Sequence, residues 1–407
     1  MLIYIQFRKK DLNKSVLDLL GTVFHYQTKG RLFMGIKVVN ITKKYKNKTI
    51  LDNLSLEIIK GSFTTILAPT GAGKTTLLRI MAGIEKATEG KVYYDGVDVT
   101  DLPVQKREIS MVFQEFINYP SLTVYENIAS PLRVLNKKYS KTEIDEKVKQ
   151  IAQRLKISHL LKRLPGEISG GEQQRTAIAR ALVKGSKFIF LDEPLGNLDY
   201  KLREELRTDL KTIFKGCTVI YATPEPVDAL SMSTHIAFLN TGKIIQYGQA
   251  NDVYLKPSSI EVGYHFSDPF MNMLECNLVK NDKKCFIKVG EEEKFILNSI
   301  KFENRLKEGE YVIGIRPQDF KINEEESDGL SFKGKIDFLE STVSTVTLGL
   351  QWENKELVCI NNNRDFQFNV GEEVKIFVNF ENCFIFDKKT RKLVIANGEF
   401  VSPTIEN

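Results

Sequence analysis

The sequence has 407 residues, of which 42% are hydrophobic and 27% are charged, with a formal net charge of +6. This length exceeds that of one ordinary domain and predicts two domains, each with a core of its own. The composition is typical of soluble globular proteins, and we expect no nucleic-acid partner, because no basic block is interleaved with aromatic residues.

No apolar run is long enough to span a bilayer, so any membrane association would require a partner protein. The five cysteines lack C-x-x-C spacing and indicate reduced cytosolic residues, not a disulfide framework or a zinc site. Residues 1–33 precede Met34, which looks like a natural start of the next domain. They are open to three interpretations: an extension, a partner-binding arm, or an upstream translation artefact.

From residue 34 to residue 265, short β-branched runs alternate with amphipathic stretches, which predicts βα units around a mostly parallel sheet. The runs 64–69, 187–192 and 218–223 are expected strands, and the stretches 74–84 and 200–214 are expected helices. Residues 140–157 have helical spacing with acidic residues near their start, which predicts a helical insert.

After residue 265 the pattern changes to short strands separated by Gly, Asn and Asp. This change predicts a second domain, all-β and barrel-like, over residues 266–400, with 401–407 as a tail. The junction between the domains is expected at residues 266–275.

The first motif lies between an expected strand and an expected helix, the context that a phosphate-binding loop needs. Glycines let backbone N–H groups turn toward phosphates, and the helix N-terminus favours negative charge. Lys74 would reach the terminal phosphates and Thr75 would ligate Mg²⁺, whereas the alternative is a glycine-rich turn before an ordinary helix. The motif consists of Thr70, Gly71, Ala72, Gly73, Lys74, Thr75 and Thr76.

Ala68 stands where the usual phosphate-loop pattern begins with glycine. We expect this substitution to be tolerated, because a residue at a strand end adopts a negative φ that alanine accepts. The phosphate cradle itself begins at Gly71.

The second motif is a pair of carboxylates at the end of an apolar strand. Strand alternation sends adjacent side chains in different directions, so Asp192 is expected to face the Mg²⁺ shell and Glu193 an attacking water. The alternative is a strand end with two solvated acids.

The third motif is Ser169, Gly170, Gly171 and Glu172. The serine could cap a helix, and the glycines would expose backbone N–H groups to an anion. Taken alone, this motif is equally compatible with a simple N-cap.

The order of "GAGKTT", "SGGEQQR" and "FLDEP" resembles the ATP-binding subunit of an ABC transporter, a P-loop NTPase cassette. The resemblance implies a second ATPase subunit, the same or a paralogous chain, packed head to tail. Each ATP would then lie between one subunit's phosphate loop and the other's signature, residues 169–172.

The same resemblance implies roles for three further residues. Tyr45 would stack on adenine, although the sequence alone makes it a half-buried strand residue. Gln114 would contact Mg²⁺ and the attacking water, acting with Glu193 in catalysis and with Thr75 and Asp192 in metal binding. Asp199 would lie in the loop across the dimer interface.

The stretches "MVFQEFINYPSLTVYENIASPL", "GIRPQDF" and "FIFDKKTRKL" resemble the ATPases of carbohydrate-type ABC importers. This implies an oligomer-binding-like regulatory domain (TOBE/MOI-type) at the C-terminus, two membrane permeases, an external solute-binding protein and a peripheral place on the cytoplasmic face of the plasma membrane. The segment around Gln114, with Phe116, Tyr119 and Pro120, would receive the permeases' coupling helices. Phe116 and Tyr119 are equally compatible with core aromatics.

"DEPLGNLDYKLREELR", "YATPEPVDAL" and "FSDPFMN" look closest to the ATPases of glycerol importers. The expected solute is therefore glycerol, a polyol, a sugar or glycerol phosphate, chosen by the permeases and the binding protein. A soluble ABC ATPase without a transport role is the alternative, but such proteins usually have two cassettes or a long coiled-coil insertion, and this chain has neither.

One position departs from the family pattern. Where these ATPases place a histidine that contacts the γ-phosphate, this chain has Pro224, which offers neither a side-chain donor nor a backbone N–H. The four histidines, His25, His159, His235 and His265, do not fall at an equivalent place in the sequence.

Two interpretations of this substitution remain. In the first, Glu193 hydrolyses ATP without the histidine, helped by positioning and by the cations of the phosphate loop. In the second, the subunit binds ATP, hydrolyses it weakly and pairs with a faster ATPase chain. We expect the first, because the residues that bind phosphate, metal and water are all retained.

Overall fold

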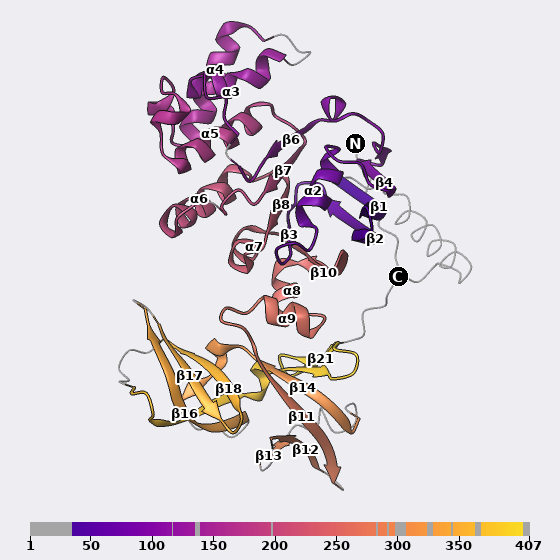
Figure 1. The fold of residues 1–407 in the computed structure, drawn as a ribbon, viewed down its shortest axis with the longest axis vertical. Coiled ribbons are helices and arrows are strands. Elements are labelled where there is room, and N and C mark those ends of the chain that lie inside the picture. The colour runs from indigo at the N-terminus through magenta and orange to yellow at the C-terminus, as the bar shows by residue number, and fades with distance from the viewer. Residues whose placement is uncertain are drawn as a thin grey trace, which may run out of the picture.

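The computed structural model describes residues 35–115, 117–134, 139–196, 198–281, 284–290, 293–297, 307–323, 329–342, 345–362 and 368–401. Figure 1 shows an α/β part and an all-β part, joined through α8 (Ala250–Leu255) and α9 (Ile260–His265). Two parts of the predicted kinds are therefore present. The exact domain limits stay a prediction, and the proposed extension 1–33 and tail residues 402–407 lie outside the described residues.

The phosphate-loop motif sits on a six-stranded sheet with the order β10-β9-β3-β8-β7-β6. Neighbouring strands pair in parallel, except that β10 pairs antiparallel with β9. The central strands are fully buried, which is why the sequence reads there as continuous apolar runs. The strands are β3 (Phe63–Leu67), β6 (Ile109–Val112), β7 (Phe188–Asp192), β8 (Thr218–Thr223), β9 (His235–Asn240) and β10 (Lys243–Gln249), of which β3, β7 and β8 confirm the predicted strands.

A smaller antiparallel sheet has the order β2-β1-β4-β5. One hydrophobic cluster joins this sheet, helix α2 (Lys74–Ala82) and the larger sheet, with Ile36, Leu77 and Phe190 among its members. The helix that follows the phosphate loop is therefore packed between two sheets. The strands are β1 (Gly35–Tyr45), β2 (Lys48–Ile59), β4 (Glu89–Tyr94) and β5 (Val97–Asp98).

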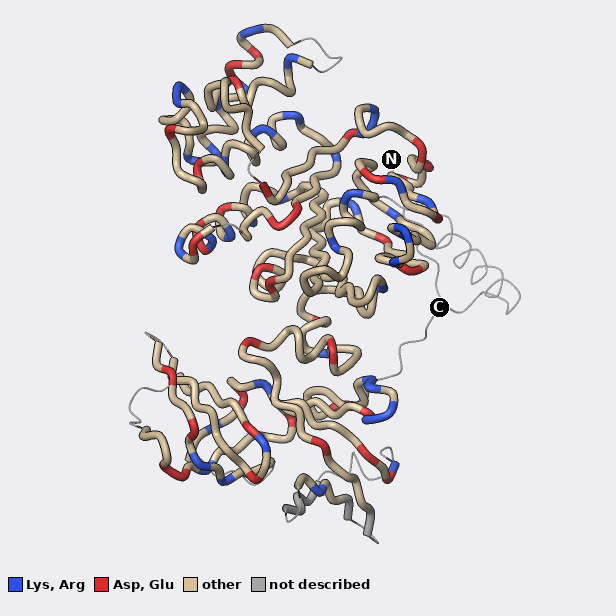
Figure 2. The backbone as a smooth tube through the Cα atoms, viewed as in Figure 1, with Lys and Arg blue, Asp and Glu red and all other residues tan. Residues whose placement is uncertain are grey.

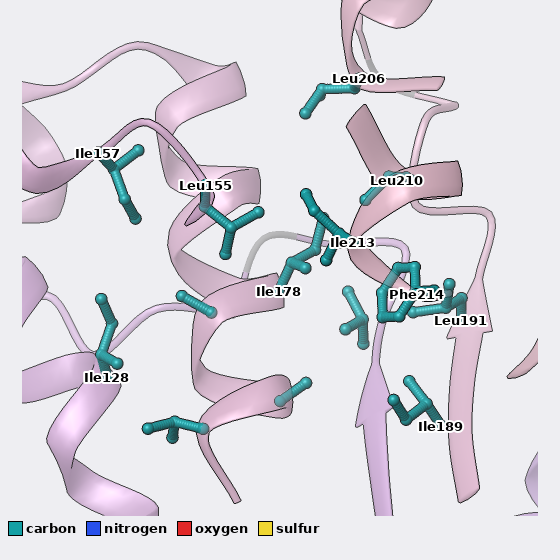
Figure 3. Packing of buried hydrophobic residues seen from close by; sticks show 14 of the residues in the cluster. Ile128, Leu155, Ile157, Ile178, Ile189, Leu191, Leu206, Leu210, Ile213 and Phe214 are labelled. Atoms are coloured by element: carbon teal, nitrogen blue, oxygen red, sulfur yellow. The ribbon is translucent and has the colours of Figure 1, made fainter. Parts of the chain in front are cut away.

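The helical insert is confirmed. Ser140 caps α4 (Lys141–Arg154) with a reciprocal capping box to Glu143, which explains why that helix begins where the sequence indicates. Figure 3 shows Leu155 of the insert and Ile178 of α5 (Gly170–Val183) packed near Ile213, in the same cluster as Leu191 of β7. The helices of this part are α3 (Val124–Val134), α4 (Lys141–Arg154), α5 (Gly170–Val183), α6 (Tyr200–Ile213) and α7 (Pro226–Met232).

The C-terminal part is all-β, as predicted. Its strands form a seven-stranded sheet, β13-β12-β11-β14-β20-β21-β22, and a five-stranded sheet, β15-β19-β16-β17-β18. The two sheets share one core that includes Ile313 and Phe332, and a closed barrel-like form stays a prediction. The strands are β11 (Asn272–Asn281), β12 (Lys284–Val289), β13 (Glu293–Leu297), β14 (Gly309–Ile315), β15 (Lys321–Ile322), β16 (Gly329–Ser341), β17 (Val346–Trp352), β18 (Lys355–Asn361), β19 (Glu373–Asn379), β20 (Phe384–Asp387), β21 (Leu393–Ala396) and β22 (Glu399–Phe400).

Figure 2 shows Lys and Arg interspersed with Asp and Glu along the described chain. The net charge nevertheless differs between the two parts of the sequence, because residues 34–265 contain 33 Lys and Arg against 25 Asp and Glu, whereas residues 266–407 contain 19 against 25. Among the described helices, none has both the length and the apolar character that a membrane crossing requires.

Candidate functional site: a phosphate-binding loop facing two carboxylates

The phosphate loop connects β3 to α2 through backbone that glycine favours. Gly71 has φ +83° and Gly73 has φ +102°, both in the left-handed region that L side chains rarely adopt. A Cβ atom on Gly73 would lie 3.0 Å from the side chain of Leu51 and 3.1 Å from that of Ile50. The loop therefore requires glycine directly before Lys74, the first residue of α2, where helix N–H groups are free to bind an anion.

Ala68 is accommodated as the sequence predicted. It is fully buried, it does not have a positive φ, and its backbone N–H donates to the carbonyl of Thr223 at 3.3 Å. The residue thus continues the pairing of β3 with β8 and takes no part in the turn that follows.

The buried Lys74 forms an ion pair with the partly buried Glu193. The Nζ atom of Lys74 lies 2.7 Å from Oε1 of Glu193, and the Nε2 atom of Gln114 lies 3.4 Å from Oε2 of the same carboxylate. Glu193 follows the last residue of β7 with φ +44°, and its N–H donates to the carbonyl of Ala222. The turn after β7, and not strand alternation, therefore determines where Glu193 points.

Asp192 contacts the residue next to Lys74. The Oγ1 atom of Thr75 donates to Oδ1 of Asp192 at 2.9 Å, and the aspartate is 1% exposed. Burial raises the pKa of Asp192, while the Thr75 hydrogen bond and the nearby cations oppose that rise. Hydroxyl and carboxylate oxygens are the ligands that Mg²⁺ prefers, so Thr75 and Asp192 fit the predicted metal.

Tyr45 lies beside the first turn of α2. Its hydroxyl donates to Glu85 and is also close to Thr76, and its ring is 45% exposed. Burial, together with Glu85, raises the pKa of this phenol. The Nζ atom of Lys43 lies 4.8 Å from the ring centroid, so a cation already occupies one face of the ring. Stacking of adenine on Tyr45 stays a prediction.

The signature residues begin α5, on a different side of the domain from α2 (Figure 1). Ser169 caps the helix, and the Oε2 atom of Glu172 accepts from the Ser169 N–H at 2.8 Å. This hydrogen bond lowers the pKa of Glu172 despite partial burial. A Cβ atom on Gly171 would lie 2.3 Å from the side chain of Leu202, so glycine is needed there for packing.

Asp199 is connected to the signature through the same leucine. Its carboxylate accepts from the N–H of Leu202 at 3.0 Å and caps α6, while the side chain of Leu202 covers Gly171. The loop predicted to lie at a dimer interface and the signature therefore share one packing contact. The interface role of Asp199 stays a prediction.

A cavity lies beside one residue of the groove predicted around Gln114, namely Tyr119, whereas neither Gln114 nor Pro120 lines it; the groove's role stays a prediction. A cavity of about 550 Å³ is lined by residues that include Met111, Tyr119, Pro131 and Arg180, and the guanidinium of Arg180 lies 4.9 Å from the Tyr119 ring centroid. Tyr119 is 48% exposed, so its interpretation as a core aromatic is wrong. Phe116 lies outside the described residues.

Sequence reasoning missed the packing of His265. This residue ends α9, and its ring centroid lies 5.1 Å from that of Phe238 in β9. Burial lowers the pKa of His265. Nothing local in the sequence signals the contact, because it joins segments that are far apart in the chain. His235, by contrast, stacks on Tyr247 and lies near Thr234.

Comparison with known proteins agrees with this geometry. Residues 51–196 match the family model described as "ABC transporter". The chain is 33% identical to the trehalose/maltose import ATP-binding protein MalK of Thermococcus litoralis, over 88% of this chain and 99% of that protein. It is 39% identical to the Fe(3+) ions import ATP-binding protein FbpC of Fusobacterium nucleatum, over 73% of this chain and 78% of that protein.

A third relative is the sn-glycerol-3-phosphate import ATP-binding protein UgpC of Pectobacterium atrosepticum. It is 35% identical over 72% of this chain and 82% of its own length. The names of the three relatives cover a sugar, a metal ion and a glycerol phosphate, so the family is shared while the solute differs. The chain belongs to the ATP-binding subunits of ABC-type importers and is an ATPase of that family.

Proposed function

We propose that this subunit hydrolyses Mg²⁺-bound ATP at the site around Lys74 and uses that reaction to power solute import through partner permeases. The observation that carries the proposal is the convergence of a phosphate-loop lysine and hydroxyl with two carboxylates, Asp192 and Glu193. A site that had lost its activity would not be expected to retain the contacts among the lysine, the hydroxyl and the two carboxylates. Bound Mg²⁺ would neutralise phosphate charge.

The chemistry assigned to the protein's own groups is simple. Lys74 leaves Glu193 to bind the terminal phosphates, and Glu193, thus released, accepts a proton from the attacking water as the water oxygen bonds to the γ-phosphorus. The bond between the γ-phosphorus and the oxygen bridging it to the β-phosphate breaks at the same time, so ADP leaves with that oxygen and inorganic phosphate is formed. Gln114, which already contacts the Glu193 carboxylate, orients the same water. Thr75 and Asp192 would hold the metal.

We further propose that two ATPase subunits form the working unit. Residues 169–172 of one subunit would then meet the ATP bound by the other, because the capped N-terminus of α5 presents backbone N–H groups to an anion. Placement of α5 away from α2 supports this (Figure 1). Asp199 would lie at the same interface, since Leu202 connects it to Gly171.

The groove around Tyr119 is proposed as the surface that receives the two permeases. It adjoins β6, which ends shortly before Gln114. A permease helix bound there would therefore respond to changes around Gln114 in the ATP site. The subunit would then be peripheral on the cytoplasmic face of the plasma membrane, and an external binding protein would deliver the solute. Glycerol, a polyol, a sugar or glycerol phosphate is the proposed solute, supported by two of the three relatives named above.

Pro224 favours a second candidate: a subunit that binds ATP but hydrolyses it weakly beside a faster chain. Glu193→Gln in the assembled transporter separates the two. If this chain hydrolyses ATP, the substitution lowers transporter ATPase activity about 100-fold or more, because it removes the base. Unchanged activity would assign hydrolysis to the partner chain. The same assay without permeases gives the basal rate.

A further inference from the structure

A second cavity lies where the α/β part meets the all-β part, beside α9 (Figure 1). Its volume is about 740 Å³, and both parts line it: Pro69 and Phe238 come from the α/β part, whereas Met273 and Val312 come from β11 and β14. Among the described residues that line this cavity, none belongs to the predicted ATP site. Cavities of this size hold small organic molecules.

Two stacked aromatic rings form part of the cavity wall. Tyr264 of α9 and Phe270 lie nearly parallel, with ring centroids 4.4 Å apart and an interplanar angle of 6°. The stack leaves Phe270 59% exposed, although phenylalanine is among the residues most often buried. The face of an aromatic ring is negative and attracts cations, so the wall offers an organic cation both apolar area and a favourable field.

The charged groups around the cavity include more carboxylates than cations. Glu261 and Arg391 both line it and form an ion pair. Glu275 also lines it and pairs with Lys388, but the Nζ atom of Lys388 lies 3.1 Å from Glu275 and 3.4 Å from Glu310. One ammonium group therefore serves two carboxylates, and the wall at Glu275 keeps negative charge that a bound cation would neutralise.

We propose that this cavity binds a small organic cation, with its charged group beside Glu275 and its apolar body against Phe270 and Met273. An anion fits less well, because Arg391 already pairs with Glu261 and the aromatic faces repel negative charge. A metal ion fits less well too, because the described residues contain no group of three side chains that could hold one. The bound cation would contact both parts of the chain and so favour the arrangement that the structure shows.

The test measures binding of three small probes to the full-length chain without nucleotide, by titration calorimetry. 2-Phenylethylamine is a cation at neutral pH, 2-phenylethanol has the same apolar body without charge, and 3-phenylpropionate is an anion. We expect the amine to bind about fivefold more tightly than the alcohol, because a cation on an aromatic face beside a carboxylate contributes about that factor. The propionate should bind most weakly.

Two variants with matched controls locate the binding. Glu275→Gln removes the carboxylate and Phe270→Ala removes the exposed ring, and each should weaken binding of the amine about fivefold. Glu373→Gln is the control for the first, because Glu373 forms a surface ion pair with Lys333. Phe338→Ala is the control for the second, because this ring is 43% exposed and does not line the cavity. Both controls should bind the amine as the wild type does.

The proposal is overturned if 2-phenylethylamine does not bind, or binds no more tightly than 2-phenylethanol. Equal affinities of Glu275→Gln and Glu373→Gln would overturn it as well, and so would tighter binding of 3-phenylpropionate, which would indicate an anion site. If Phe270→Ala does not fold, Phe270→Leu keeps an apolar side chain without the aromatic face and gives the same comparison. Because binding is measured without ATP, a chain that fails to hydrolyse ATP contradicts the proposed function alone.

Discussion

The Nζ atom of Lys74 lies 2.7 Å from Oε1 of Glu193, and the two side chains are 4% and 15% exposed. The group expected to bind the terminal phosphates and the group expected to take a proton from water therefore neutralise each other. In the proposed function, ATP phosphates would replace Glu193 as the partner of Lys74. The Glu193 carboxylate would then become free when the substrate binds.

Lys74→Ala is expected to weaken both ATP binding and the fold. The substitution removes the phosphate ligand and leaves the largely buried carboxylate of Glu193 without its cation, which costs the folded state about 3 kcal/mol or less, given its partial exposure. Titration calorimetry measures the affinity and denaturant unfolding the stability. Lys86→Ala is the control, because Lys86 pairs with Asp101 at the surface and its loss changes neither quantity. Equal ATP affinity in Lys74→Ala and the wild type would contradict the assignment.

Ala68→Gly tests whether the missing first glycine matters. Ala68 is fully buried and its backbone lies outside the left-handed region, so glycine offers no new conformation that the loop uses. We expect the ATP affinity to stay the same and the free energy of unfolding to fall by about 1 kcal/mol, because glycine adds backbone entropy to the unfolded chain. A large gain in ATP affinity would show that alanine impairs the loop.

Ser169→Ala separates the capping role of the signature from its proposed role in a dimer. Ser169 and Ser140 make the same capping box at the starts of α5 and α4, so either alanine substitution costs about 1 kcal/mol of stability. Only Ser169→Ala is expected to lower the ATPase rate of the assembled transporter, with ATP binding to the isolated chain unchanged. Equal ATPase rates for Ser169→Ala and Ser140→Ala would show that Ser169 acts only as a helix cap.

Asp192→Asn is expected to stabilise the chain while removing its response to Mg²⁺. Burial raises the pKa of Asp192, so the folded chain binds this proton more readily than the unfolded chain. Stability is therefore lost as the pH rises through that pKa, and the loss persists at neutral pH. Asparagine avoids the loss and still accepts from Thr75.

Thermal unfolding checks this prediction directly. At neutral pH without nucleotide, Asp192→Asn should melt above the wild type, and the difference should shrink as the pH approaches about 4, the pKa of an ordinary aspartate. Mg²⁺-bound ATP should raise the melting temperature of the wild type alone. A wild type that melts above Asp192→Asn at neutral pH would contradict the assigned cost of the buried charge.

Much of the fold follows from local pattern. The buried strand β7 and the capped helix α4 are evident in the sequence, because apolar runs and a Ser-x-x-Glu box are local signals. The phosphate loop is equally evident, since its glycines have no other common use before a lysine and a threonine.

The remaining features depend on contacts between distant segments. Strand alternation gives the direction of Asp192 but not of Glu193, because β7 ends between them and Glu193 adopts φ +44°. The ion pair with Lys74 follows from that turn. The contact between His265 and Phe238 depends on how α9 packs on the sheet, which no periodicity in either segment encodes.

The most direct test of the central claim is ATP binding and turnover by Glu193→Gln beside the wild type, in the presence of Mg²⁺. If Lys74 and Glu193 form a working site, the wild type hydrolyses ATP, and Glu193→Gln loses about 100-fold or more in rate. The variant should also bind ATP more tightly, because a neutral amide holds Lys74 less strongly than a carboxylate does. A wild-type chain that does not bind ATP, or a Glu193→Gln variant that hydrolyses ATP at the wild-type rate, would contradict the account.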